Sequence, residues 1–218
     1  MSVYKKMFQI LLALLLTTSF SAMAEKGPVE GVHYKQITPA QPTSAPAGKV
    51  EVLEFFWYGC PHCFRFESHI SKWLGEKSDN VVFTRIPAAI SPKWELHARV
   101  YYAAEALGIL EKIHNPLFEA IHVKRKRLNK KEDILDFIKG LGVDSKKFDQ
   151  TMRSFAVSSK MQRAKKLGEA FNLDGVPSIV INGKYFTSGS LAGSYEGMIQ
   201  LINVLSKKEL SNNTASIK

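Results

Sequence analysis

The sequence predicts an α/β fold in which a run of helices interrupts a β-sheet. Apolar segments of strand length stand on both sides of that run, at Val50 to Phe56, Val81 to Ile86 and Ser178 to Ile181. Between them, from about Pro92 to Asn172, apolar residues recur at helical spacing. A Cys-Pro-His-Cys sequence at residues 60–63 follows the first apolar segment directly and indicates a turn from strand into helix. We therefore expect one sheet-containing unit with a helical insertion.

The first 24 residues are typical of an export signal. Lys5 and Lys6 form a positively charged region, Phe8 to Leu16 is apolar, and residues 22–24, Ala-Met-Ala, form a small-x-small cleavage site. The apolar stretch is shorter than the roughly 20 residues that cross a bilayer, although an uncleaved anchor helix is an alternative. We expect cleavage after Ala24 and a soluble protein outside the cytoplasm, where disulfides persist.

Cleavage would leave 194 of the 218 residues, enough for one domain with an insertion. The formal net charge would fall from +10 to about +8, because Lys5 and Lys6 leave and no acid does. Because the protein is expected to be exported, we do not expect nucleic acid as a partner of this basic chain. We also expect a monomer. The basic run at residues 124–127, continued at Lys130 and Lys131, is interpreted as a solvated helix end or loop. Anionic lipid head groups and acidic clients are alternative partners for it.

The remaining elements are predicted in chain order. A first strand around Val32 to Ile37 precedes a Pro-rich connector, and a helix begins at Pro61, after the second strand. The insertion is predicted to contain helices at Trp94 to Leu107, Leu110 to Val123, Ile134 to Leu141, Phe148 to Phe155 and Met161 to Phe171. The pair Asn182-Gly183 then predicts a hairpin between Ser178 to Ile181 and Tyr185 to Thr187. A last helix is expected at Tyr195 to Leu205, and the polar tail, residues 211–218, is expected to be disordered.

Cys60 and Cys63 are the only cysteines, and their spacing favours a redox-active dithiol. As a structural staple, their four-residue loop would restrict the unfolded chain by only roughly 2 kcal/mol, against roughly 3 kcal/mol for fifteen residues. Zinc would need a second ligand pair at a familiar spacing, which is missing. Covalent haem would need His directly after Cys63, where Phe64 stands. We expect no bound cofactor or metal, because the redox group is the cysteine pair itself.

The predicted helix start explains how Cys60 could be reactive. Pro61 suits a first helical turn, so free backbone N–H groups would face the Cys60 sulfur and favour its thiolate. Hydrogen bonds from the amides of His62 and Cys63, and a partly charged His62 ring, are candidates for a larger effect. A stabilised thiolate makes the disulfide a strong oxidant, so the pair should donate its disulfide through a mixed disulfide at Cys60.

Glu54 lies in the middle of an apolar strand that is predicted to be covered on both faces. Burying a carboxylate is costly, so this acid should be paired, protonated or functional. Six residues before Cys60, it is placed to relay a proton to or from Cys63. Exposure at a strand end, or pairing with Arg85 on a neighbouring strand, is the alternative. Glu51, nearer the start of the strand, is expected to be solvated.

Together the export signal, residues 54–63 and the sequence Gly-Val-Pro-Ser at residues 175–178 closely resemble the DsbA family, the periplasmic thiol:disulfide oxidases of Gram-negative bacteria. The likeness covers nearly the whole mature chain. It implies a thioredoxin-like fold with an inserted helical domain. Residues 25–91 and 175–210 would form the thioredoxin-like domain, and residues 92–174 the insertion.

The resemblance also implies roles for single residues. Cys60 would be the exposed nucleophile, Cys63 the buried resolving cysteine, and Pro61-His62 the dipeptide that sets the redox potential. Further implied roles are those of Glu54 as the family's buried acid and of Val176 and Pro177 as its cis-proline pair, where the Val176 backbone would pair with an extended client. The sequence alone leaves the isomer of Pro177 open.

The function predicted from these observations is that of a periplasmic disulfide oxidase acting on reduced exported proteins. The resemblance implies reoxidation by a DsbB-like membrane quinone reductase. An oxidising disulfide is a property of the family that the chain resembles. The resemblance therefore implies the same direction of disulfide transfer, from this protein to its clients, as the argument from the Cys60 thiolate. The alternatives are a disulfide isomerase or reductase, and a peptide-binding chaperone or copper-handling protein of the same fold.

Overall fold

The computed structural model describes residues 27–215, so the predicted signal peptide, residues 1–24, lies outside the described residues. The strands in this part of the chain are β1 (Lys35–Gln36), β2 (Val50–Phe56), β3 (Val81–Pro87), β4 (Ser178–Ile181) and β5 (Tyr185–Ser188). They form one sheet in the order β1-β5-β4-β2-β3. β2 and β3 are parallel, and the other neighbours are antiparallel. All seven residues of β2 are buried, as expected for a strand covered on both faces.

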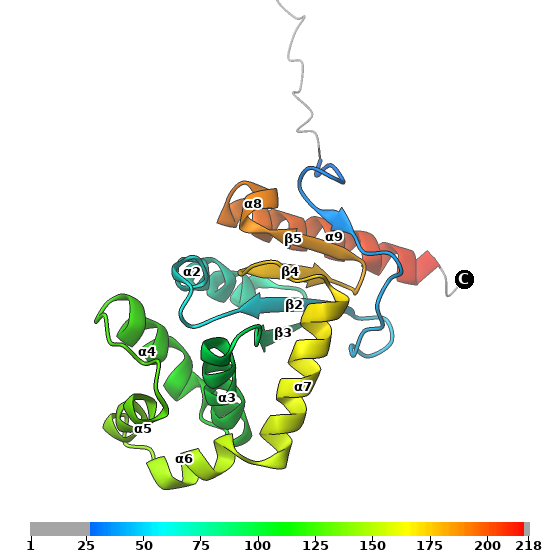
Figure 1. Ribbon diagram of the computed structural model, residues 1–218. Coiled ribbons are helices and arrows are strands. Elements are labelled where there is room, and N and C mark those ends of the chain that lie inside the picture. The colour runs from blue at the N-terminus through cyan, green and yellow to red at the C-terminus, as the bar shows by residue number, and fades with distance from the viewer. Residues whose placement is uncertain (1–26, 216–218) are drawn as a thin grey trace, which may run out of the picture.

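The helices fall into two groups. Those between β3 and β4 are α3 (Pro92–Ala106), α4 (Leu110–His122), α5 (Lys131–Gly140), α6 (Ser145–Met152) and α7 (Phe155–Ala170). The others are α2 (Pro61–Glu76), α8 (Gly189–Ala192) and α9 (Tyr195–Ala215). In Figure 1, α3 to α6 form a lobe at one side of the sheet, and α7 leads from it back to β4. The predicted α/β fold with a helical insertion is confirmed.

Alternate residues of β2 belong to two hydrophobic cores, because side chains of a strand point to opposite faces in turn. Val50 and Val52 pack with residues of α2 and α9. Leu53 and Phe55 pack with residues of the inserted helices. Glu54 stands in the alternation of Val50 and Val52, so it faces α2. The sheet therefore places this acid beneath the helix that follows Cys60.

Two helix boundaries differ from the prediction, because a capping residue sets them. The helix predicted at Phe148 to Phe155 ends at Met152, and α7 begins at Phe155 rather than at Met161. Ser154 separates α6 from α7, since its hydroxyl accepts a hydrogen bond from the amide of Val157 at 3.3 Å and so caps α7. Apolar spacing alone does not reveal such a break.

Other expectations were wrong in extent. The first strand covers only Lys35–Gln36, and Val32, which the prediction included, is 58% exposed. The last helix continues through Ala215, so the expectation of disorder is wrong for residues 211–215. Buried residues at Leu205 and Glu209 hold α9 against the sheet and support its continuation. Residues 216–218 lie outside the described part of the chain.

Glu51 is buried, not solvated as predicted, because the chain before β2 covers it. Its Oε1 accepts a hydrogen bond from the amide of Ser44 at 2.9 Å.

In residues 27–215 there is no helix whose length and apolar character would let it cross a membrane.

Candidate active site

Cys60 occupies the N-cap position of α2, directly before Pro61. Its extended backbone (φ −88°, ψ 117°) lets its own sulfur accept a hydrogen bond from the amide of Cys63 at 3.4 Å. The sulfur also lies 3.3 Å from the carbonyl oxygen of Val176, to which the thiol form donates. Both cysteines are free thiols in this structure.

The surroundings of Cys60 lower the pKa of its thiol from 9.0 to about 6. A hydrogen bond from the Cys63 thiol is the largest cause and outweighs burial, which acts in the opposite direction. The amides of Cys63 and His62 contribute next, and the charge of the His62 ring last. The predicted donors are therefore present, but sequence reasoning missed the thiol of Cys63 itself. At neutral pH the reduced site holds a Cys60 thiolate.

Cys63 has the opposite character. It is fully buried, and burial, followed by the hydrogen bond to Cys60, raises the pKa of its thiol well above the usual value. Cys60 is 8% exposed, so it is the accessible member of the pair but less open than the resemblance implied. The two sulfurs differ strongly in acidity, so Cys60 is the better leaving thiolate and Cys63 is the sulfur that favours its protonated form.

Val176 and Pro177 lie beside Cys60 across the site, and the bond between them is cis. They line a groove of about 780 Å³ together with His62 and segments of α8 and the start of α9. The structure thus brings Cys60, His62, Val176 and Pro177 to one surface. Glu54 stays beneath it, fully buried.

His62 points away from the fold towards the start of α9. Its Nδ1 lies 3.0 Å from Nη2 of Arg65 and 3.3 Å from the Tyr195 hydroxyl. These contacts among His62, Arg65 and Tyr195 lie at the surface.

The turn that carries Cys60 is fixed by aromatic packing. Trp57 stacks on Trp94 with ring centroids 4.5 Å apart and an angle of 6°. A Cβ atom at Gly59 would collide with the Trp57 ring, which explains glycine at this position. Tyr58, the next residue of this turn, is fully buried.

Glu54 is the first member of a buried charged network. Its Oε2 lies 3.1 Å from Nε of Arg85, so the pairing weighed as an alternative is present. The Arg85 Nη2 lies 3.0 Å from Oε2 of Glu67, whose Oε1 is 3.3 Å from Nε2 of His114. The Tyr58 hydroxyl is 2.9 Å from Nδ1 of His114. The network therefore joins β2, β3, α2 and α4 beneath the dithiol.

Burial is the dominant influence on Glu54 and raises its pKa from 4.5 to about 8, against the lowering effect of Arg85. The carboxyl group therefore holds its proton at neutral pH. The charged form of Glu54 adds a small contribution to the raised pKa of Cys63, after burial and the Cys60 thiol. Sequence reasoning missed Glu67 and His114. Glu67 follows Cys63 by four residues, so helical spacing would have placed both on one face.

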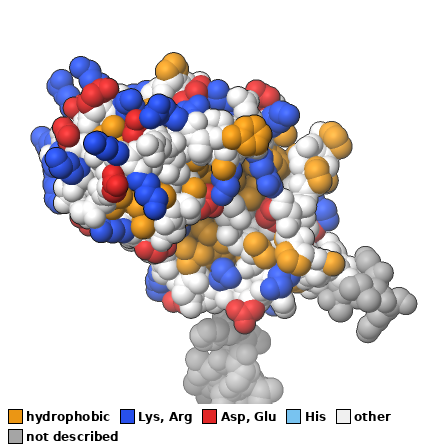
Figure 2. Space-filling model, turned by 90° about the horizontal axis from the view of Figure 1, so that it is seen from below, with side chains coloured by type: hydrophobic (Ala, Val, Ile, Leu, Met, Phe, Trp, Pro, Cys, Tyr) orange, Lys and Arg blue, Asp and Glu red, His pale blue; other side chains and the backbone are white. Residues whose placement is uncertain are grey.

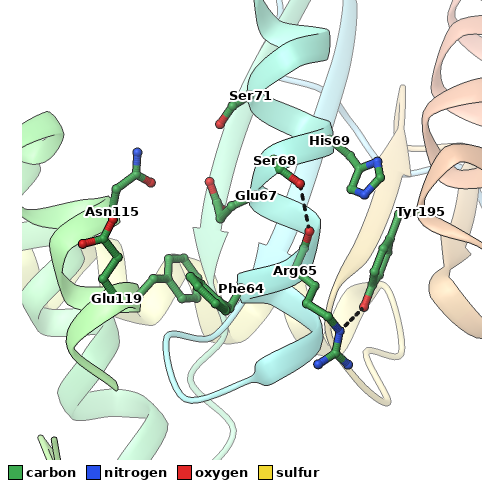
Figure 3. A pocket seen from close by; sticks show the side chains of 10 residues that line it. Phe64, Arg65, Glu67, Ser68, His69, Ser71, Asn115, Glu119 and Tyr195 are labelled. Atoms are coloured by element: carbon green, nitrogen blue, oxygen red, sulfur yellow. Dashed lines mark hydrogen bonds between the residues drawn. The ribbon is translucent and has the colours of Figure 1, made fainter. Parts of the chain in front are cut away.

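A second cavity, of about 580 Å³, lies behind the active-site helix between α2, α4 and the start of α9. In Figure 3, Glu67 projects from α2 towards the side of α4 that carries Asn115 and Glu119. The buried network thus reaches solvent at this cavity, on a different side of α2 from the groove at Pro177. Among residues 27–215, no cluster of three or more His, Cys, Asp and Glu side chains is arranged to hold a metal ion.

Comparison with known proteins decides the family. Residues 51–193 match the family described as DSBA-like thioredoxin domain. The chain belongs to the DsbA-like family. The thiol:disulfide interchange protein DsbA of Pseudomonas aeruginosa is 41% identical to this chain over 203 residues, covering 92% of the chain and 95% of the relative. The DsbA of Burkholderia cepacia is 38% identical over 204 residues, covering 94% and 96%.

Solved DsbA structures show the same fold. The crystal structure of Pseudomonas aeruginosa DsbA superposes with a TM-score of 0.80 at 40% identity, covering 87% of this chain and 97% of that one. The oxidoreductase DsbA from Xylella fastidiosa gives a TM-score of 0.78 at 33% identity, covering 84% of this chain and 98% of that one. The thioredoxin-like fold with a helical insertion is thereby confirmed. This DsbA-like chain is a thiol:disulfide oxidoreductase, with Cys60 and Cys63 as its redox pair.

Proposed function

We propose that the protein oxidises thiols of exported proteins in the periplasm by donating its Cys60–Cys63 disulfide. The observation that carries this direction is the stabilised Cys60 thiolate at the start of α2. A folded structure that favours this thiolate favours the reduced dithiol, and so makes the disulfide oxidising.

The reaction proceeds in two exchanges. A client thiolate attacks Cys60, a bond forms between the client sulfur and Cys60, and Cys63 leaves as a thiolate. A second client thiolate then attacks the client sulfur of this mixed disulfide, and Cys60 leaves with the electron pair. The client gains one disulfide, and the protein becomes a dithiol. Because the Cys60 thiolate is stable, the second exchange releases a good leaving group.

Glu54 serves as the proton donor for the departing Cys63. Its raised pKa keeps it protonated at neutral pH, and the still higher pKa of Cys63 makes transfer to that sulfur favourable. Pro61 and His62 act by shaping the helix start and by supplying an amide and a ring charge to Cys60.

Val176 and Pro177 bind the client. An extended client segment in the groove of about 780 Å³ pairs with the Val176 backbone and brings its thiol to Cys60. Backbone pairing adds affinity without requiring a particular client sequence, which suits an enzyme with many substrates.

Location, partners and domain limits complete the proposal. Cleavage after Ala24 releases the mature protein into the periplasm, and a DsbB-like membrane quinone reductase reoxidises it. The thioredoxin-like domain consists of residues 25–91 and 175–210, and the inserted helical domain of residues 92–174.

The redox equilibrium of the Cys60–Cys63 pair against glutathione tests the direction of transfer. It can be followed by tryptophan fluorescence, since Trp57 lies three residues before Cys60. We expect a potential well above that of the glutathione couple. A potential near or below glutathione's would instead support a reductase or isomerase. Copper retention by the reduced protein would support the copper-handling alternative.

A further inference from the structure

Two carboxylates share one guanidinium beneath the dithiol. Glu54 and Glu67 contact Nε and Nη2 of Arg85 at 3.1 and 3.0 Å. One cation cannot balance two buried carboxylates, so at neutral pH one of the two carboxyl groups keeps a proton. Which one keeps it decides whether Glu54 can act as an acid towards Cys63.

Burial and solvent contact already distinguish the two groups. Glu54 is 0% exposed, and within residues 27–215 its only polar contact is with Arg85. Glu67 is 8% exposed and lines the open cavity between α2 and α4, as Figure 3 shows. The charged form is therefore favoured at Glu67.

His114 also favours the charged form at Glu67. Its Nε2 lies 3.3 Å from the Glu67 oxygen that does not contact Arg85. Its Nδ1 is 2.9 Å from the Tyr58 hydroxyl, which has no other hydrogen-bond partner among the described residues. The Tyr58 hydroxyl therefore donates to Nδ1, and the imidazole keeps its proton on Nε2, facing Glu67.

We propose that His114 is a positioning residue that directs the single proton of the Glu54–Glu67 pair to Glu54. With its Nε2 3.3 Å from Oε1 of Glu67, His114 favours the carboxylate there and leaves the acid form at Glu54. A side chain of the inserted helices thus prepares the proton donor of the thioredoxin-like part. The inference rests on the proposed role of Glu54 as that donor.

Titratable or charged groups surround this pair from several elements. Tyr101 of α3, with its ring 6.0 Å from the His114 ring, completes the set. The groups are Cys63 and Glu67 of α2, Arg85 of β3, Tyr101 of α3, His114 of α4 and Tyr58 of the active-site turn. Among these groups, His114 contacts Glu67 directly, at 3.3 Å, and makes no described contact with Glu54.

Carbon-13 NMR of protein labelled at the glutamate carboxyl carbons tests this inference. In His114→Leu the ratio of Glu67-protonated to Glu54-protonated protein at pH 6 should rise about tenfold, the lower range for a hydrogen bond to a charged group. His114→Gln keeps a donor towards Glu67 and should restore the wild-type ratio. Asn115→Ala, at the exposed neighbouring position of α4, is the matched control and should leave the ratio unchanged.

An unchanged ratio in folded His114→Leu would overturn the inference. If that variant does not fold, nitrogen-15 NMR of the wild-type imidazole decides instead, because the inference requires a proton on Nε2 and none on Nδ1 at pH 7. The opposite tautomer would overturn it. These signals report proton location and not catalysis. A changed ratio with unchanged client oxidation would therefore contradict the role of Glu54 and leave that of His114 intact.

Discussion

Cys60 accepts hydrogen bonds from the Cys63 thiol and from two backbone amides, and the His62 ring adds only its charge. In His62→Leu the amide at position 62 remains and the charge is lost. We expect the Cys60 pKa to rise from about 6 by less than about one unit. Thiolate absorbance of the reduced protein against pH measures this, with Cys60→Ser as the blank. An unchanged pKa would remove the ring from the account.

The buried carboxyl group of Glu54 lowers the stability of the folded protein at neutral pH. Its pKa is 4.5 in the unfolded chain and about 8 in the folded protein, so between these values only the folded state holds the proton. Stability therefore falls as pH rises through this window. Glu54→Gln should be more stable than wild type by about 2 to 3 kcal/mol at pH 7, and no more stable at pH 4. Urea unfolding at the two pH values measures this difference.

The same variant should oxidise clients about tenfold or more slowly, because Cys63 loses its proton donor. Glu51→Gln on the same strand is the control for activity, since the hydrogen bond of the Glu51 side chain within residues 27–215 is the one from the Ser44 amide. Equal client-oxidation rates in wild type and Glu54→Gln would contradict the donor role.

At the scale of elements, Glu209 joins the last helix to the hairpin. Buried on α9, it accepts hydrogen bonds from Asn182, Lys184 and Tyr185 around the turn between β4 and β5. Burial would raise its pKa, but these donors outweigh burial and lower it. The hairpin turn itself requires Gly183, whose φ of 63° favours glycine.

Glu209→Ala should therefore destabilise the protein by about 2 to 3 kcal/mol at pH 7. Because the folded pKa of Glu209 is depressed, its contribution is present above the unfolded pKa and is lost as pH falls through the folded value. Thermal unfolding at pH 7 and pH 3 measures both effects. Glu196→Ala, at the exposed start of α9, is the control. A loss of stability of equal size at both pH values would contradict the assignment.

At the scale of the whole molecule, one face carries side chains of both charges. Figure 2 shows Lys and Arg side chains interspersed with Asp and Glu on the face seen from below. The basic run after α4 is exposed, as a solvated loop should be, and Lys131 at its end lies 3.6 Å from Asp149. Leu128 anchors this loop in the core, and its carbonyl contacts His97 at 2.7 Å.

The sequence by itself determined the elements and the chemistry of the dithiol. The apolar run of β2, the turn at Cys60 and the Asn182-Gly183 hairpin are local features, because strand alternation, helix starts and tight turns depend on residues close in the chain. For the same reason Glu54 was identified as an unusual buried acid. Helix ends and the short β1 were less predictable, because capping and edge pairing decide them.

Only the tertiary structure decided what surrounds those residues. The contact of Cys60 with Val176 joins positions 116 residues apart, and that of Tyr58 with His114 joins positions 56 apart. No periodicity encodes such pairs. They form because the sheet brings the cis-proline turn beside the start of α2, and because the insertion packs α4 against it. Burial then sets the acidities of Cys63 and Glu54, since the cost of removing a charge from water depends on the folded surroundings and not on neighbours in the chain.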